Sequence, residues 1–151
     1  NELQKLEALS LTRKKITQED IFNLTNLSED YGIFELVDNY LAKNKIKVSK
    51  ILNENNFVND DCILILRTLL NRSKRLLKLK NIQKEKDNID QVISSYKPSI
   101  FWKEKDLVKQ QIKNWSEKEI KEKIYQISNL EILTKKNTSS INLVSDLISN
   151  Y

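Results

Sequence analysis

The residues most able to do chemistry are basic, and they gather in one segment of the chain. Residues 67–86 contain eight Lys or Arg residues and a single acid, Glu85. At helical spacing Arg67, Lys74 and Lys78 lie on one face, and a basic face of this kind can contact nucleic-acid phosphates. No aromatic residue interleaves these cations, so base stacking has no platform there. We therefore favour a solvated outer helix face, and weak phosphate contact is the most that these three cations indicate.

A second candidate is an acid at a position where the helical pattern predicts an apolar residue. Isoleucines mark the apolar face of a helix expected over residues 116–136, and Glu131 continues this face four residues after Ile127. A carboxylate directed at a core must be paired, protonated or turned toward a partner. Lys135, four residues further on, can reach Glu131, and so can an arginine of the long helix. The alternative is that the helix nears its end and Glu131 reaches water; the sequence leaves both hypotheses open.

Three aromatic residues near one predicted helix are the candidate contact residues. Trp102 and Trp115 flank this helix, and Phe101 precedes the first of them. Aromatic side chains of this kind most often pack in a core. The alternative is an interface, because Trp is enriched among the residues that dominate binding energy. The sequence favours packing.

The composition excludes most catalytic and metal chemistry. The chain has no histidine, one cysteine (Cys62) and one glycine (Gly32). A disulfide within the chain, a His/Cys zinc site and a histidine-based triad are therefore excluded. A phosphate loop needs two glycines, so ATP binding of that type is excluded as well. Cys62 lies in an apolar run, which predicts a buried thiol. We expect no catalytic site, no cofactor and no metal.

The length and composition are those of one globular domain, or of one domain with part of a neighbour. In 151 residues, 39% are apolar and 31% charged, and the net charge of +5 permits weak, salt-sensitive attraction to DNA. No apolar stretch approaches the roughly 20 residues of a membrane span. Because the chain starts at Asn1 and contains no methionine, we expect it to be a fragment of a longer protein.

Helical periodicity with almost no Gly or Pro predicts an all-α, multi-helix bundle. No strand alternation or hairpin signal is present. A polar break at residues 12–15 is the candidate domain boundary. We expect helices over residues 2–11, 18–25, 28–41, a short one ending at 53–56, 59–84, 89–95, one reaching about 114, 116–136, and a last one capped by Thr138.

Several helix details follow from particular residues. Thr17 and Asp20 are expected to start one helix, and residues 28–30 to start a second that buries Phe34 with Val37 and Leu41. Asn55 and Asn56 are expected to end the next helix, because Asn tolerates the left-handed conformation. Asn59 or Asp60 is the expected cap of the longest helix. A stripe of leucines around Ser73 should form its buried face. Ser116 and Glu119 form a capping box, and Val144, Leu147, Ile148 and Tyr151 align in the last helix.

An ordered set of short segments resembles one protein family, the delta subunits of bacterial DNA polymerase III clamp loaders. The resemblance spans nearly the whole chain, and the order and spacing of the segments are more specific than any single one. Asn55 and Asn56 occupy the place where the family often has Gly, and the backbone conformation expected there tolerates Asn. The matching segments are residues 1–6, 16–21, 33–41, 50–52, 63–67, 101–103, 115–116 and 130–135.

The resemblance implies a function in assembly. Residues 1–16 would be the end of an AAA-type lid domain, and residues 17–151 the helical collar that holds the clamp-loader subunits in a ring-like pentamer. The partners would be the other clamp-loader subunits, with the sliding clamp contacted by an N-terminal domain outside this sequence and DNA contacted only in the full complex. No enzymatic activity is expected of this chain, since partner subunits hydrolyse ATP, and the location would be cytoplasmic.

Two other classes of function compete with assembly. The first is an independent basic helical module that binds DNA or RNA, for which the cations of residues 67–86 are the evidence. The second is an enzyme, which the absence of His, of a glycine loop and of any metal-ligand cluster leaves poorly supported.

Overall fold

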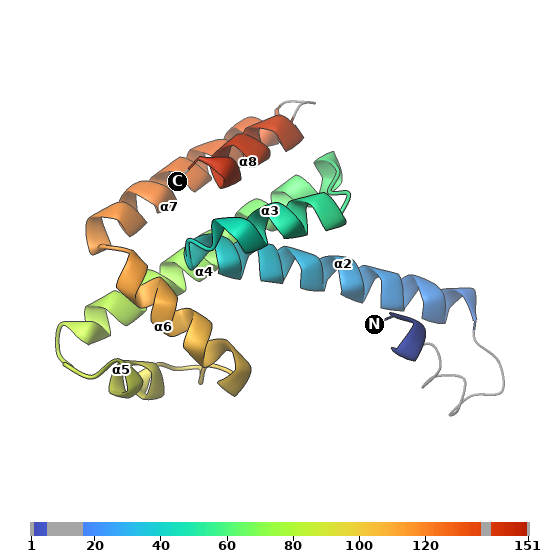
Figure 1. The fold of residues 1–151 in the computed structure, drawn as a ribbon. Helices are drawn as coiled ribbons and strands as arrows, with labels where there is room; N and C mark the ends of the chain where they lie inside the picture. Colours follow the sequence, from blue (N-terminus) through green and yellow to red (C-terminus); the bar gives the residue numbers. More distant parts are fainter. Residues whose placement is uncertain (1, 6–16, 137–139, 151) are drawn as a thin grey trace.

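The computed structural model describes residues 2–5, 17–136 and 140–150, and within these ranges it is all-helical, as predicted (Figure 1). No helix of these ranges has the length and apolar character to cross a membrane. Residues 2–5 are helical; the remainder of the helix expected over 2–11 and the polar break at 12–15 lie outside the described residues. The main elements are α2 (Gln18–Leu41), α3 (Lys45–Glu54), α4 (Asn59–Gln83), α5 (Ile89–Ser95), the 3-10 turn η1 (Trp102–Glu104), α6 (Lys105–Asn114), α7 (Glu117–Thr134) and α8 (Ser140–Ser149).

Helix α4 is the central element of the bundle. It packs against α2, α5, α6, α7 and α8, with α7 and α8 running along one side of it in Figure 1. The predicted leucine stripe forms its buried face: Leu66, Leu69 and Leu76 are almost fully enclosed, and Ser73 lies buried between them. Each such leucine contributes about 1.5–3 kcal/mol through removal from water. Burial of this one stripe therefore packs most of the other helices against α4.

Helix α2 is a single helix of 24 residues, and the prediction of two helices here is wrong. Its start is confirmed: the Thr17 hydroxyl accepts from the Asp20 amide at 3.1 Å, and the Asp20 carboxylate accepts from the Thr17 amide at 3.1 Å. The polar residues 28–30 lie inside the helix instead of capping a second one. Ser and Asp cost well under about 1 kcal/mol in a helix interior, so they do not end a helix whose far half is packed.

Phe34 does not belong to the buried face of α2. Val37 and Leu41 are buried as predicted, but 42% of Phe34 is exposed. The buried face runs instead through Ile33, Leu36 and Tyr40 along with Val37, at the spacing of one helical stripe. Phe34 lies at the edge of this stripe, and its ring faces a pocket described below.

The end of α3 differs from the prediction in one respect. Helix α3 ends at the predicted asparagines, but Asn55 is extended (φ −110°) and not left-handed. The Ile51 carbonyl accepts from both the side-chain amide of Asn55 at 2.9 Å and its backbone amide at 3.0 Å, so Asn55 closes the last turn. The left-handed residue among those described is Lys43 (φ 54°), just after α2.

The predicted cap of α4 is also wrong. The N-cap residue is Val58, whose side chain has no acceptor, and the Asp61 carboxylate accepts from the Val58 amide at 2.8 Å. Asn59 has a different partner: its side-chain oxygen accepts from the amide of Ile141, in the first turn of α8, at 3.0 Å. A long-range contact thus replaces the local cap that the sequence pattern indicates.

The C-terminal helices follow the prediction closely. The capping box of α7 forms, with the Ser116 hydroxyl accepting from the Glu119 amide at 3.2 Å. In α8, Val144 and Ile148 are buried and Leu147 is partly buried. The predicted cap Thr138 and the aligned Tyr151 lie outside the described residues.

Gly32 and Asn55 provide a test of the packing between α2 and α3. A Cβ added at Gly32 would lie 2.9 Å from the Asn55 side-chain oxygen, which is too close. Gly32→Ala should therefore give no gain in the free energy of unfolding, although Ala is normally about 1 kcal/mol better than Gly inside a helix. In the Asn55→Ala background the same change should give that full gain. Urea unfolding of the four variants measures both effects, and an equal gain in both backgrounds would contradict this packing.

Candidate functional site

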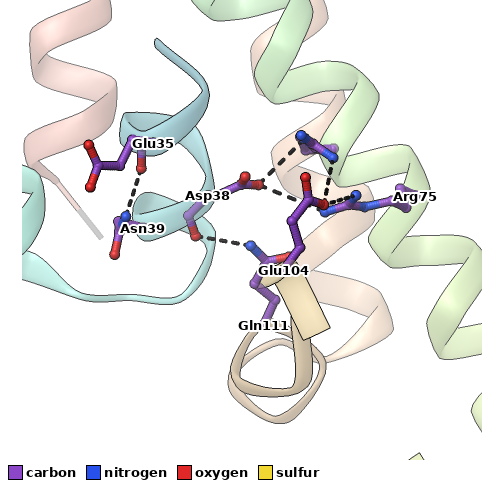
Figure 2. A network of polar contacts seen from close by, with 7 residues as sticks. Glu35, Asp38, Asn39, Arg75, Glu104 and Gln111 are labelled. Carbon is purple, nitrogen blue, oxygen red and sulfur yellow. Dashed lines mark hydrogen bonds and ion pairs between the residues drawn. The ribbon is translucent and has the colours of Figure 1, made fainter. Parts of the chain in front are cut away.

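A partly buried ion network joins α2, α4 and η1 (Figure 2). Asp38 of α2 faces two arginines of α4, with its Oδ1 atom 3.5 Å from Arg72 Nε and 3.8 Å from Arg75 Nη2. The same arginines contact Glu104 of η1, at 3.4 Å from Arg72 Nη1 and 3.0 Å from Arg75 Nη1. Two guanidinium groups thus share two carboxylates, and the charges balance.

Burial dominates the electrostatics at Asp38. Desolvation raises the pKa of this carboxyl above its ordinary value, and the charges of Arg72 and Arg75 offset only part of that effect. Asp38 Oδ1 and Arg75 Nη2 are also buried without a hydrogen bond, because their separation is too long for one. The Asp38 main chain is held separately, by Gln111 of α6, whose amide donates to the Asp38 carbonyl at 3.0 Å. The network is therefore compact, but two of its buried polar atoms lack a hydrogen bond.

The network positions a short turn that exposes two large aromatic residues. Glu104 is anchored by both arginines, and its amide donates to the Phe101 carbonyl at 2.9 Å. Phe101 and Trp102 begin this turn, are 56% and 68% exposed, and have ring centroids 5.8 Å apart. Single exposed rings are common, but exposed rings that gather in one place often mark an interaction site, since burying them together would remove a large apolar area from solvent.

Two adjacent pockets open beside these rings. The first has a volume of about 450 Å³, and the second about 360 Å³. Phe34, Phe101, Arg72 and Glu104 line both, so the pockets form one continuous hollow over the ion network. The remaining lining residues are Thr68, Asn71, Arg75, Tyr96, Pro98, Ser99 and Ile100 in the first pocket, and Tyr31, Glu35, Asp38, Asn39, Lys47, Lys103 and Leu107 in the second.

Three exposed aromatic residues line this hollow, Tyr31, Phe34 and Phe101, and Trp102 lies against the ring of Phe101; we refer to these four residues as the aromatic face. Tyr31 and Phe34 come from α2, while the other two belong to the turn at η1. Tyr31 is 67% exposed and lines the second pocket with Phe34 and Phe101. The face therefore combines residues that are about 70 positions apart in sequence, brought together by the shared packing of α2 and η1 on α4.

Trp115, the third predicted aromatic, lies elsewhere and is buried. Its indole nitrogen donates to the Leu41 carbonyl at 2.6 Å, and its ring centroid lies 6.4 Å from that of Tyr40. The Lys43 ammonium lies over the Trp115 ring at 4.4 Å. Trp115 thus fixes the end of α2 against α6, which is a packing role.

The structure places Glu131 between the two cations that the sequence suggested. Its Oε1 atom lies 3.3 Å from Lys135 Nζ and 3.3 Å from Arg67 Nε of α4. The side chain is 18% exposed, so it lies at the edge of the α4–α7 contact and not in the core. Hydrogen bonds from Lys135 and then Arg67 lower the pKa of Glu131 below its usual value.

The three cations proposed as phosphate contacts do not act as one set. All three are exposed on α4, but the charge of Arg67 is opposed by Glu131. Lys74 and Lys78 remain as the exposed cations of that face. Two lysines on one helix give a weak and salt-sensitive attraction to phosphate at most.

Sequence reasoning did not identify the ion network or the aromatic face as a whole. The available signal was positional: Arg72 and Arg75 lie three residues apart beside the buried Ser73, and Asp38 directly follows the buried Val37. Charged residues in such positions are directed toward neighbouring elements and need partners. Counting the cations of residues 67–86 together concealed the fact that Arg72 and Arg75 point inward and that Lys80 donates to the Ile112 carbonyl of α6.

The arrangement of these groups suits binding better than catalysis. Cys62, the one thiol, is buried, and burial raises its pKa, which makes it a poor nucleophile. Among the described residues, no group of three or more His, Cys, Asp or Glu side chains is placed to hold a metal ion. The carboxylates of the network are engaged by arginines, so neither is free to act as a general base.

The ion network can be tested by a double-mutant cycle. Asp38→Asn should change the free energy of unfolding by less than about 1 kcal/mol, because burial already disfavours the charged carboxylate. Arg75→Met should lower it by about 3 kcal/mol, because Asp38 and Glu104 lose a partner. The double variant should be more stable than Arg75→Met alone. Urea unfolding at neutral pH measures all three, and strictly additive losses would contradict coupling.

Glu131 gives a prediction for the pH dependence of stability. Its folded pKa lies below the usual 4.5, so it contributes stability at higher pH, and this contribution is lost as pH falls through the folded pKa. Glu131→Gln should therefore be less stable than the parent at about pH 6, and the difference should shrink toward about pH 3. Glu117 and Glu119, whose pKa values are also lowered, are present in both proteins and cancel. Urea midpoints at several pH values provide the measurement; a gap that is absent or independent of pH would show that the two contacts contribute nothing.

Comparison with known proteins finds no family model, no curated protein and no solved structure that matches this chain significantly.

Proposed function

We propose that this chain is a protein–protein assembly module, of the kind formed by the collar of a clamp-loader delta subunit. The observation that carries the proposal is the aromatic face of Tyr31, Phe34, Phe101 and Trp102, in which three exposed rings line one hollow and the fourth lies against Phe101. Aromatic residues are enriched at protein interfaces, where they supply large contact areas and lose little conformational entropy. The resemblance of the ordered segments to delta subunits supplies the identity of the partner.

The rigidity of this face supports a binding role. Phe34 lies on a helix of 24 residues, and Glu104, which follows Phe101 and Trp102, is held by two arginines of α4. A surface that is preorganised in this way loses less freedom on association than a mobile loop would. The rings are also clustered, and clustering of aromatic anchors around a pocket is typical of the residues that dominate binding energy.

Nucleic-acid binding is the competing proposal, and the charges around the aromatic face favour it less. Strong binding of a polyanion requires several cations that are free to neutralise successive phosphates. Here Arg72, Arg75 and Lys47 are each paired with a carboxylate. On the outer face of α4, Lys74 and Lys78 are exposed, but two lysines neutralise few phosphates, and neither lines a pocket of the aromatic face. Assembly is therefore the function that we propose.

The test is to mix the chain with the clamp-loader ATPase subunit of the same source and to measure mass by light scattering after size exclusion. A mixed complex is expected. Phe101→Ala and Trp102→Ala should each weaken it by about 2 kcal/mol, roughly 30-fold in Kd, because each removes an exposed anchor. Both variants should unfold at the same urea concentration as the parent, since neither ring is buried in the free chain.

Tyr125 offers a matched control. It is an exposed aromatic residue on α7, outside both pockets of the aromatic face. Tyr125→Ala should leave the complex unchanged, and an equal loss would show that the aromatic face is not the specific contact. Separate elution of the two proteins, together with salt-sensitive binding of the chain to DNA, would favour the nucleic-acid module instead.

A further inference from the structure

The larger pocket beside the aromatic face has a chemical character that the assembly proposal leaves unexplained. Its apolar walls come from Phe34, Phe101, Tyr96 and Ile100, while its polar lining includes two guanidinium groups and only one carboxylate, Glu104. The second carboxylate of the ion network, Asp38, does not line this pocket. Asp38 still balances the arginine charges, so the pocket presents guanidinium N–H donors, and not an unpaired charge, beside apolar rings.

The arginines have donors left for a further acceptor. Each guanidinium carries five N–H groups. The network uses Nε and Nη1 of Arg72, and its contact to Asp38 is long at 3.5 Å. Arg72 lines both pockets, so it lies where they join. The Asn71 amide and the Ser99 hydroxyl line the same pocket, and neither forms a side-chain hydrogen bond with another described residue. Several polar groups thus converge on one small volume.

We infer that this pocket receives an acidic–apolar segment of the partner, with a carboxylate on Arg72 and an adjacent aromatic or aliphatic side chain between Phe34 and Phe101. The inference rests on the proposed function for the source of the segment. A volume of about 450 Å³ is enough for one or two side chains, and a guanidinium binds a carboxylate through two parallel hydrogen bonds. The remaining guanidinium donors, together with the net excess of one positive charge over the combined hollow, are complementary to a single acid.

A nucleic-acid strand fits the same pocket less well. A strand presents a phosphate at every step and is attracted by a line of unpaired cations. The combined hollow contains Arg72, Arg75, Lys47 and Lys103, but Glu35, Asp38 and Glu104 oppose them. Three of these cations are paired with carboxylates, and Lys103 of the second pocket supplies the net excess of one positive charge, which does not extend along a groove. One carboxylate beside one apolar side chain satisfies this arrangement.

The experiment uses two blocked dipeptides with the unmodified chain. N-acetyl-Phe-Glu-amide and N-acetyl-Phe-Gln-amide differ only in the charge, and each is titrated into ¹⁵N-labelled protein while amide and arginine Nε–H resonances are followed. We expect the Glu peptide to shift the resonances of Phe101 and Arg72 and to bind about tenfold more tightly than the Gln peptide, because it forms a charge-assisted hydrogen bond. Equal binding of both peptides, or no shift at the pocket, would overturn the inference.

Two further measurements separate this inference from the assembly proposal. Arg72→Lys keeps the charge but not the paired donors, and it should reduce the preference for the Glu peptide while circular dichroism reports an intact fold. An oligo(dT) of about 12 nucleotides that shifts the same resonances more strongly than the Glu peptide would overturn the acidic segment in favour of nucleic acid. The peptide experiment does not require the ATPase subunit. Selective binding of the Glu peptide without formation of a mixed complex would support the acidic-segment inference and contradict the proposed partner. A mixed complex without selective binding of the Glu peptide would contradict the acidic-segment inference alone.

Discussion

Two arginines of α4 that face inward require partners from other parts of the chain, and much of the remaining structure depends on this requirement. Arg72 and Arg75 are mostly enclosed, and an enclosed guanidinium without a carboxylate costs several kcal/mol. Asp38 and Glu104 meet this cost only if α2 and η1 both lie against the same stretch of α4. The network therefore fixes where two elements dock, and hydrophobic burial, which has no direction, supplies most of the energy.

The same helix separates its cations into two groups with different roles. Lys74 and Lys78 point to solvent, whereas Arg72 and Arg75, at adjacent positions, are held between elements. A shift of one residue along a helix turns a side chain by about 100°, which is enough to move it from water to an interface. Net charge or a count of basic residues therefore says little about function here, because three of the four cations that line the hollow are paired with carboxylates within the fold.

The sequence predicted the helices well because apolar periodicity and capping are local. The leucine stripe around Ser73, the Ser116–Glu119 capping box and the limits of α5 all follow from neighbouring residues. The errors occurred where a distant contact decides the outcome: α2 continues through residues 28–30, and Asn59 bonds to α8 and does not cap α4. The candidate site could be predicted only in part, since Phe101 and Trp102 were named, but their relation to residues of α2 depends on the tertiary fold.

The aromatic face and the ion network together determine which groups could bind in the hollow, because the rings offer apolar area and the arginines require hydrogen-bond acceptors. Exposed rings alone would bind apolar surfaces with little discrimination. Polar groups at the floor of the hollow change this, since an apolar group placed over Arg72 would leave donors without acceptors, at a cost comparable to a lost hydrogen bond. A partner must therefore match the rings with apolar area and the guanidinium groups with an acceptor. In the proposed interface, specificity would come from the same charges that hold α2 and η1 in place. Removing those charges would therefore also disturb the fold that presents the rings.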